Sequence, residues 1–244
     1  MADLEQARRW LAEAGRICAL TGAGISAESG VPVFRGAGGL WRQYRAEELA
    51  TPEAFAADPR LVWEWYDWRR SVVARAEPNA GHLTLVELER RADEFTLVTQ
   101  NVDGLHESAG SQRVLKLHGD LWMLRCTGCG AESANREVPL KQLPPRCACG
   151  ALLRPGVVWF GEALPTDVLE AAFQAAGRAE VFLVVGTSAV VQPAASLPLG
   201  AKRAGARLIE VNLEPTPMTE LADASFHGPA GDLLPQLVEA GVRQ

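Results

Sequence analysis

The chain has 244 residues, of which 48% are hydrophobic and 22% are charged, and it carries a formal net charge of −6. These values are typical of a globular protein with one sizeable core, or with one large and one small domain. The net charge and the lack of any block of Lys or Arg speak against a nucleic-acid surface, and no apolar run approaches the ~18 residues of a membrane span. Residues 1–15 predict an amphipathic helix without the apolar region of a signal peptide, so we expect a cytoplasmic protein.

A short β-run at residues 16–20 opens into a glycine-rich turn. Gly22 and Gly24 allow the backbone to approach a phosphate closely, and the amides at the start of a following helix would point toward it. The pattern predicts an anion site, although glycine turns are common and the full G-x-G-x-x-G spacing is missing. Phe34 and Arg35 follow in an irregular segment, for which an ordinary surface loop is the alternative.

Residues 52–75 predict a separate helical segment that is unusually aromatic. Three of the seven Trp residues fall within residues 63–68, and most of these rings are expected in a core. Tyr66 and Arg69 are three residues apart, so they share one face of the helix. A phenol beside a guanidinium is a good receptor for a carboxylate. From the spacing alone, however, a solvated Arg beside a buried Tyr is the simpler interpretation.

Two short β-runs within residues 97–120 each end in polar side chains. Gln100, Asn101 and Asp103 follow the first run, and His118 follows the second. In an open parallel sheet, the groups just past the carboxyl ends of the strands line the ligand crevice. His118 is the best candidate for a proton acceptor, because the unperturbed pKa of imidazole, ~6.5, is the closest to neutrality. A lone histidine at a strand end is more often structural, but here other ligand-type residues also follow strands.

Four cysteines form two close pairs that predict a metal site. Cys126 and Cys129 are separated by two residues, and Cys147 and Cys149 by one. Four thiolates at such spacing can close a tetrahedral zinc site, which would be saturated and therefore structural. Only one residue separates the members of the second pair, where two are usual, but both thiolates can still reach the same metal ion. Disulfides are the less favoured interpretation without an export signal. We expect the fifth cysteine, Cys18, to be a small buried apolar residue.

The remaining pattern alternates strands and helices. A continuous apolar run at 181–185 is typical of a central parallel strand buried on both faces. The alternation predicts an α/β fold with a doubly wound parallel sheet. The other elements expected are a helix at 83–91, an apolar strand running into a glycine turn at 153–162, helices at 166–176 and 194–205, and a last strand at 207–211.

Together these motifs resemble the sirtuin family of NAD-dependent protein lysine deacylases. The resemblance implies a Rossmann-like NAD-binding domain with a small zinc-binding plus helical domain inserted, and a cleft between them where NAD and the acyl-lysine meet. The resembling segments follow the family's order over nearly the whole chain; they are 22–26, 99–103, 117–120, the four cysteines and 186–188. The implied boundaries are 1–38, 79–122 and 151–244 for the large domain, 39–78 for the helical module and 123–150 for the zinc-binding module.

The resemblance also implies a role for each candidate site residue. His118 would act as a general base on the ribose hydroxyls after the acyl oxygen has displaced nicotinamide, and the products would be nicotinamide, 2′-O-acyl-ADP-ribose and free lysine. One structural zinc ion would be held by Cys126, Cys129, Cys147 and Cys149. The residues implied to bind NAD are Gly22, Ala23, Gly24, Ile25, Ser26, Ala27, Phe34, Arg35, Gln100, Asn101, Val102, Asp103, Gly186, Thr187, Ser188, Asn212, Leu213, Glu214 and Ala230. Those implied to bind the acyl-lysine substrate are Ala50, Tyr66, Arg69, Val157, Trp159 and Phe160, the last three along a channel where the peptide would add as a strand.

Within the family, a Tyr-x-x-Arg pair at this point of the helical module marks members that accept acidic acyl groups. Tyr66 and Arg69 would meet the distal carboxylate, and the small Ala50 would leave room for the longer chain. The resemblance therefore predicts a desuccinylase and demalonylase that keeps some deacetylase activity.

The resemblance leaves alternatives open. These are a sirtuin-like NAD glycohydrolase or ADP-ribosyltransferase, a sirtuin that is mainly a deacetylase, and a module that reads acyl-lysine without turnover. A plain Rossmann dehydrogenase is disfavoured because the full dinucleotide fingerprint is missing. We expect acyl-lysine proteins as partners, no nucleic-acid or membrane partner, and a monomer.

Overall fold

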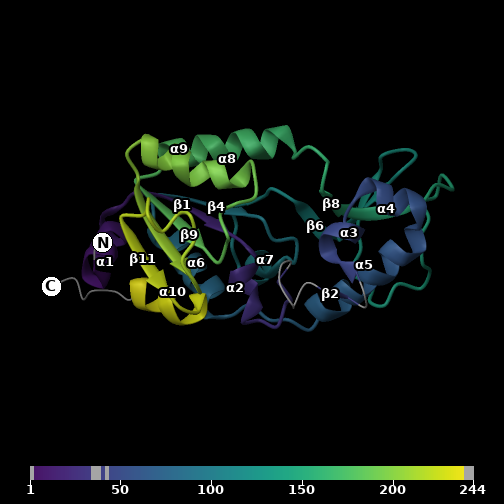
Figure 1. The fold of residues 1–244 in the computed structure, drawn as a ribbon, viewed down its shortest axis with the longest axis horizontal. Coiled ribbons are helices and arrows are strands. Elements are labelled where there is room, and N and C mark those ends of the chain that lie inside the picture. Colours follow the sequence, from purple (N-terminus) through teal and green to yellow (C-terminus); the bar gives the residue numbers. More distant parts are fainter. Residues whose placement is uncertain (1–2, 34–39, 42–43, 239–244) are drawn as a thin grey trace.

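The computed structural model describes residues 3–33, 40–41 and 44–238. In this part of the chain, a parallel sheet with helices on both faces occupies one end of the molecule, and smaller antiparallel sheets with further helices occupy the other (Figure 1). The α/β class with a doubly wound parallel sheet is thereby confirmed. Among the described residues, no helix combines the length and the apolar character that a membrane crossing requires.

The large sheet has six parallel strands. They are β1 (Arg16–Thr21), β4 (Glu94–Thr99), β5 (Val114–Lys116), β9 (Val181–Val185), β10 (Arg207–Asn212) and β11 (Ala224–His227). Their order in the sheet is β11-β10-β9-β1-β4-β5. After β1 the chain adds strands on one side, and from β9 onward it adds them on the other. Doubly wound sheets bind their ligands at such a switch point, here between the carboxyl ends of β1 and β9.

Helices cover both faces of this sheet because alternate strand residues face opposite sides. Ala19 and Leu97 belong to one fully buried core, and their neighbours Leu20 and Val98 belong to another. The helices over the first core are α1 (Leu4–Glu13), α6 (Ala80–Arg91) and α10 (Ala230–Val238), and those over the second are α8 (Thr166–Arg178) and α9 (Leu197–Arg203). Figure 1 shows α8 and α9 together above the sheet and α10 below it.

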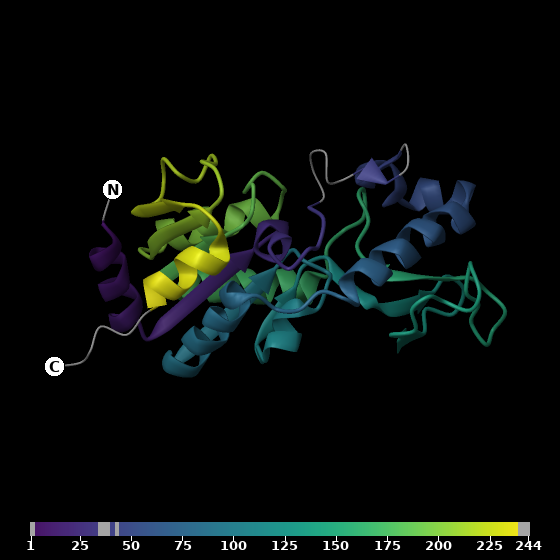
Figure 2. The same cartoon turned by 90° about the horizontal axis from the view of Figure 1, so that it is seen from below.

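The other end of the molecule is built on a three-stranded antiparallel sheet in the order β7-β6-β8. Its strands are β6 (Gly119–Cys126), β7 (Glu132–Ala134) and β8 (Leu153–Val157); beside it are a hairpin of β2 (Leu40–Trp41) and β3 (Tyr44–Arg45) and the helices α3 (Ala46–Leu49), α4 (Pro52–Ala57) and α5 (Pro59–Val73). The inner face of α5 shares a core with Leu121, Leu124 and Val157 of the small sheet, and Figure 2 shows the helix lying along that sheet. The chain passes from the large sheet to the small one through Leu117 and His118, which lie between β5 and β6.

Capping side chains explain where two helices differ from the sequence prediction. The single segment expected at 52–75 divides at Asp58, which ends α4 and also caps the start of α5 by accepting the Leu61 amide at 2.9 Å. The helix expected at 83–91 begins earlier, at Ala80, because the Asn79 side chain accepts the backbone amides of the first turn. Short polar caps therefore set boundaries that apolar periodicity does not reveal.

The later part of the chain also departs from prediction. The strand expected at 153–162 ends at Val157, and the helix expected at 194–205 starts as a 3₁₀ turn (Ala194–Ser196) before α9. The strand at 207–211 is not the last, because β11 follows and pairs with β10 in parallel. Two short helices, α2 (Ala23–Ala27) and α7 (Leu105–Ala109), lie at the carboxyl ends of β1 and β4, where they shape the site.

Candidate active site

A cavity of about 800 Å³ lies where the carboxyl ends of the large sheet face the small sheet. Residues that follow β1, β4, β9 and β10 line it on one side, and residues of α5 and of the segment after β8 line it on the other. The structure therefore gathers side chains that are far apart in the sequence into one space. Of the candidate NAD and substrate residues that the structure describes, all line this cavity except Ile25, which packs fully buried in the core between α6 and α10. Phe34 and Arg35 lie outside the described residues.

Glycines bring the two loops at the switch point into contact. A Cβ atom on Gly24 would stand 2.7 Å from the carbonyl oxygen of Gly186, and one on Gly186, whose φ is +58°, would stand 2.4 Å from the amide nitrogen of Ile25. The amides of Gly22 and Gly24 donate to the carbonyls of Val185 and Gly186 at 3.1 and 2.8 Å. These two amides therefore join the loops, and the glycines contribute by permitting close approach.

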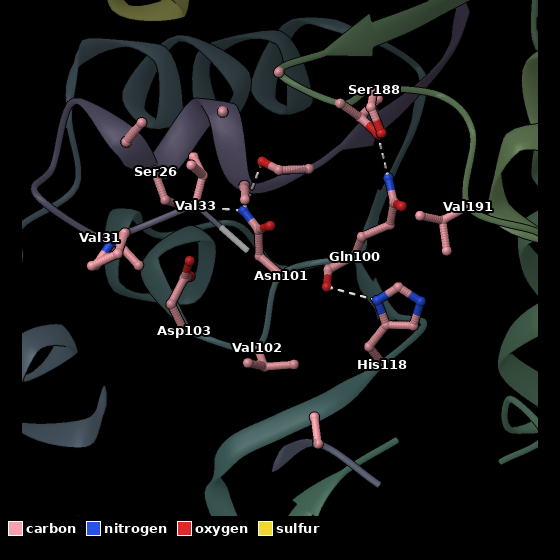
Figure 3. Close-up of a pocket in the computed structure, with 18 of the residues that line it drawn as sticks. Ser26, Val31, Val33, Gln100, Asn101, Val102, Asp103, His118, Ser188 and Val191 are labelled. Carbon is pink, nitrogen blue, oxygen red and sulfur yellow. Dashed lines mark hydrogen bonds between the residues drawn. The ribbon is translucent and has the colours of Figure 1, made fainter. Parts of the chain in front are cut away.

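Asn101 and Asp103 form a buried polar pocket beside this loop (Figure 3). The Asn101 side-chain amide donates to the Gly22 carbonyl at 3.0 Å and to the Ser26 hydroxyl at 3.2 Å. Because both of its protons are used, its carbonyl oxygen remains to accept a hydrogen bond from a ligand. Burial raises the pKa of Asp103, an effect that the Leu105 amide and the Ser26 hydroxyl partly offset. The pocket thus offers acceptors of the kind that a carboxamide N–H₂ group requires.

His118 lies on the other side of Gln100 from Asn101 (Figure 3). Its Nδ1 is 2.9 Å from the backbone carbonyl oxygen of Gln100. A carbonyl can only accept, so Nδ1 carries the proton and Nε2 is left as a free acceptor. Burial lowers the pKa of His118, and the Gln100 carbonyl partly opposes this effect. The backbone oxygen of His118 accepts the amide of Val158 at 2.9 Å, which fixes the residue between the two sheets.

Tyr66 and Arg69 lie together on the face of α5 that lines the cavity, with only 3% and 8% of their surfaces exposed. The interpretation of a solvated Arg is therefore wrong. Burial lowers the pKa of Arg69, and nearby Tyr66 and Asp103 offset part of that effect. Burial likewise raises the pKa of the Tyr66 phenol, so this group remains protonated at neutral pH. The phenolic oxygen accepts a hydrogen bond from the Trp159 indole at 2.9 Å.

The segment after β8 lines the cavity but has little free backbone for a peptide. The amides of Val158, Trp159 and Phe160 donate to the His118 carbonyl, the Glu162 carboxylate and the Ala50 carbonyl, each at 2.8 to 2.9 Å. A substrate strand can pair with these three residues only through their carbonyl groups. Phe160 is exposed, whereas Val157 and Trp159 are buried.

The far end of the cavity is formed by the loops after β9 and β10. Gln100 donates to the Thr187 hydroxyl at 2.8 Å, and Asn212 donates to the Thr187 carbonyl at 3.3 Å. Fully buried Glu210 holds the loop that follows Asn212, since it accepts hydrogen bonds from three hydroxyl groups of Thr216, Thr219 and Ser225. The cavity-lining residues that the sequence did not indicate include Val73, Val191, Gln192, Gly228 and Pro229. The sequence could have indicated Val73, because it lies four residues after Arg69 and therefore on the same face of the helix.

The four paired cysteines converge beyond the small sheet. All four Sγ atoms lie within 4.8 Å of one another, with Cys126 to Cys149 at 3.4 Å and Cys129 to Cys147 at 3.8 Å. Four sulfurs bound tetrahedrally at ~2.3 Å from a zinc ion stand about 3.8 Å apart, so the donor set fits structural zinc. The single residue between Cys147 and Cys149 is therefore enough for both of their sulfur atoms to join the cluster. Cys18 is buried in the core, which raises the pKa of its thiol to about 12 and makes it an unreactive apolar residue, as expected.

Comparison with known proteins agrees with this geometry. The family model described as "Sir2 family" matches residues 22–193. An "NAD-dependent protein deacylase" of Aquifex aeolicus is 58% identical over 211 residues, which are 86% of this chain and 88% of the relative. The structure of a Sir2 homologue mutant with 2′-O-acetyl-ADP-ribose has a TM-score of 0.93 at 53% identity and covers 97% of this chain and 95% of its own. A Sir2 complex with a p53 peptide and NAD⁺ has a TM-score of 0.88 at 33% identity and covers 98% of each chain. The chain therefore belongs to the Sir2 family, the sirtuins, which are NAD-dependent protein deacylases.

Proposed function

We propose that this sirtuin removes succinyl and malonyl groups, as well as acetyl groups, from lysine side chains of proteins, with NAD as its co-substrate. The placement of Tyr66 and Arg69 in the same cavity as His118 carries this proposal. Arg69 is the only Arg or Lys among the described residues that line the cavity. An acyl-lysine that reaches toward His118 would therefore bring a distal carboxylate to a single buried guanidinium.

The energetics of burial favour an anionic acyl group at this position. Opposite charges attract each other more strongly in a buried site than in water, and Arg69 is buried in the cavity wall. A succinyl carboxylate would therefore gain a charge-assisted contact worth ~1.5–3 kcal/mol. An acetyl group has no carboxylate and would gain nothing from this contact. The small side chain of Ala50, which also lines the cavity, leaves space for the longer acyl chain.

We place NAD along the switch-point side of the cavity. Its carboxamide would enter the pocket of Asn101 and Asp103, its phosphates would lie on the loop after β1, and its adenosine half would lie against residues 186–188 and 212–214. NAD supplies the ADP-ribose to which the acyl group is transferred, so the expected product is 2′-O-acyl-ADP-ribose, the kind of compound bound by the Sir2 homologue.

The residues of the chain itself would perform the proton transfer and exclude water. The free Nε2 atom of His118 would accept a proton from a ribose hydroxyl, with the Gln100 carbonyl holding the ring in the required tautomer. Buried Tyr66, Val157 and Trp159 would shield the acyl group from water. Structural zinc at the four cysteines would hold the small sheet, whose strand β6 directly follows His118.

The division of the chain at 38/39, 78/79, 122/123 and 150/151 stays a prediction. A reducing compartment such as the cytoplasm suits the proposed zinc site, because four thiols this close together would remain available for metal instead of forming disulfides.

Paired peptides test the proposal directly. Succinyl-lysine and acetyl-lysine peptides of the same sequence are each incubated with the enzyme and NAD, and nicotinamide release and peptide mass are followed. We expect NAD-dependent removal of both groups, with the higher kcat/KM for succinyl and with 2′-O-acyl-ADP-ribose as co-product. Turnover of the acetyl-lysine peptide alone would support deacylase activity and reject the recognition of an acidic acyl group by Tyr66 and Arg69. Nicotinamide release without any loss of acyl group would instead indicate a glycohydrolase.

A further inference from the structure

We propose that Trp159 determines acyl specificity as a positioning residue, because its indole N–H fixes the direction in which the Tyr66 hydroxyl donates. This inference rests on the proposed recognition of an acidic acyl group by Tyr66 and Arg69. It assigns Trp159 a role beyond lining the channel, since the residue would act through Tyr66 and need not touch the acyl carboxylate itself.

The direction of the hydrogen bond between these residues is set by their chemistry. An indole N–H can only donate, so the Tyr66 oxygen must be the acceptor in the 2.9 Å contact with Nε1 of Trp159. The phenol proton must then point away from the indole. Among the described residues, no acceptor is hydrogen-bonded to this proton. It is therefore left to donate to a ligand that enters the cavity lined by Tyr66.

The Trp159 indole is itself held on several sides. The guanidinium carbon of Arg154 lies 3.5 Å from the centre of the Trp159 ring, and the Phe55 ring packs against it with centroids 5.2 Å apart. Glu162 accepts the backbone amide of Trp159 at 2.8 Å and binds Arg154 through both carboxylate oxygens, at 2.6 and 2.8 Å. This clamp restricts rotation of the indole, so the orientation of the Tyr66 hydroxyl is established before a substrate binds. Preorganised donors gain specificity because less order must be imposed on binding.

The consequence differs between the acyl groups. A succinyl or malonyl carboxylate can accept the Tyr66 proton in addition to the contact with Arg69, whereas the methyl group of an acetyl cannot accept a hydrogen bond. Trp159→Phe keeps an aromatic ring but removes the indole donor, so the Tyr66 hydroxyl becomes free to turn its proton elsewhere. We expect this change to lower kcat/KM for the succinyl-lysine peptide by about fivefold to tenfold, as for the loss of one neutral hydrogen bond. Because residue 159 also lines the cavity, kcat/KM for the acetyl-lysine peptide should fall as well, but by a smaller factor, so that the succinyl-to-acetyl ratio decreases.

A double-mutant cycle tests whether Trp159 acts through Tyr66. The cycle compares the wild type, Trp159→Phe, Tyr66→Phe and the double variant in kcat and KM on both peptides. Calorimetric binding of the succinyl-lysine peptide without NAD adds a readout that does not depend on turnover. We expect Trp159→Phe to change the succinyl-to-acetyl ratio only when Tyr66 is present, mainly through KM and the calorimetric Kd.

Trp63→Phe is the matched control. Trp63 is also a fully buried tryptophan, and its indole donates to the Leu153 carbonyl at 2.8 Å instead of to Tyr66. Trp63→Phe should lower Tm by about as much as Trp159→Phe does, and it should leave the succinyl-to-acetyl ratio of kcat/KM unchanged. An equal loss on both peptides in Trp159→Phe, or a shift of the ratio that persists without Tyr66, would overturn the inference while leaving the acidic pocket intact. A wild type that does not prefer succinyl would overturn both proposals together.

Discussion

The Nδ1 atom of His118 lies 2.9 Å from the backbone carbonyl oxygen of Gln100. This contact makes one tautomer of the ring dominant and directs the unprotonated Nε2 atom away from Gln100. Gln100 also reaches the Thr187 hydroxyl at 2.8 Å, so the residue that orients the base is itself tied to the loop after β9. Gln100 therefore links the proposed base, through its backbone carbonyl, to the opposite end of the cavity, through its side chain.

The pH profile of deacylation should report the state of His118. Burial lowers the pKa of His118 below its ordinary value of 6.5, so the neutral, base-competent form persists to lower pH than for a free imidazole. We expect the acidic limb of kcat/KM against pH to have its midpoint below 6.5. His118→Ala should lower kcat by ~10²–10⁴, the usual contribution of a general base, and should remove that limb from the residual rate. A midpoint above 6.5 would contradict the assigned environment.

Two other histidines should control stability at low pH. His82 and His106 are buried with ring centroids 4.8 Å apart, and burial lowers the pKa of His82 to about 4 and that of His106 to about 3. The unfolded chain binds these protons near pH 6.5, so it holds more protons than the folded chain between pH 6.5 and about 4. The free energy of unfolding is therefore highest above pH 6.5 and falls as pH decreases through this window, by roughly 2 kcal/mol per histidine at pH 5.

Urea unfolding at pH 7.5 and pH 5 measures this effect. His106→Asn should reduce the difference between the two values by about 2 kcal/mol, whatever it does to the stability at pH 7.5. His227→Asn is the control, because His227 is exposed at the end of β11. If the control and His106→Asn change the pH dependence equally, the pH effect does not come from the buried pair.

Replacing Arg69 should change which acyl group is preferred. Arg69→Met keeps much of the volume and removes the charge, so kcat/KM for succinyl should fall roughly tenfold to hundredfold, equivalent to the ~1.5–3 kcal/mol of a charge-assisted contact. The acetyl rate should change little. Arg60→Met on the same helix is the control, since Arg60 is exposed and pairs with Glu64 on the surface. An unchanged preference in Arg69→Met would show that the acid pocket is misassigned.

Contact between the two glycine loops makes a steric prediction. Gly24→Ala would place a methyl group 2.7 Å from the Gly186 carbonyl oxygen, and such overpacking costs ~1–3 kcal/mol. Since the loops would have to separate, KM for NAD should rise as stability falls. Gly177→Ala is the counterpart: Gly177 lies in helix α8 with no other atom within 4 Å of its Cβ position, so that variant should be neutral or slightly more stable. Chemical denaturation and NAD titrations of both variants separate the two outcomes.

Local sequence patterns predicted the fold class and most of the candidate residues that line the cavity, and they did so for a physical reason. Parallel strands place their carboxyl ends at one edge, so side chains that follow them, such as Asn101, His118 and Asn212, must meet there whatever the loops between them do. The spacing of the four cysteines likewise predicts that their sulfur atoms can meet at one metal ion, because the members of each pair are close in the sequence.

What escaped prediction depends on contacts between distant segments or on which side of a helix faces the core. Strand β11 is short and partly polar, and its identity depends on pairing with β10. The Tyr66–Trp159 hydrogen bond joins residues that are 93 positions apart. Ile25 belongs to a motif that lines the cavity, yet its own side chain is buried in the core. The burial of Arg69 also escaped the argument from spacing, which favoured a solvated side chain, because spacing alone does not reveal burial.

The zinc site should support the catalytic end of the molecule as well as the small sheet. Strand β6 starts immediately after His118 and ends at Cys126, whose sulfur belongs to the four-thiol cluster. Cys126→Ser should therefore lose bound zinc, measured as metal per chain, and lower Tm, since structural zinc contributes directly to folding. A loss of about 2 kcal/mol in the free energy of unfolding lowers Tm by roughly 4–8 °C in a chain of this size.

Cys18→Ala provides the comparison, because Cys18 is equally buried but lies in β1 of the large sheet. It should retain one zinc ion per chain and full metal-dependent stability. If Cys126→Ser keeps its metal, or loses it without any change in Tm or kcat, the cluster does not brace the strand that follows His118. If it loses metal, stability and deacylation together, while Cys18→Ala keeps all three, the zinc-bound sulfurs fix the far end of that strand and thereby help to hold His118 in place.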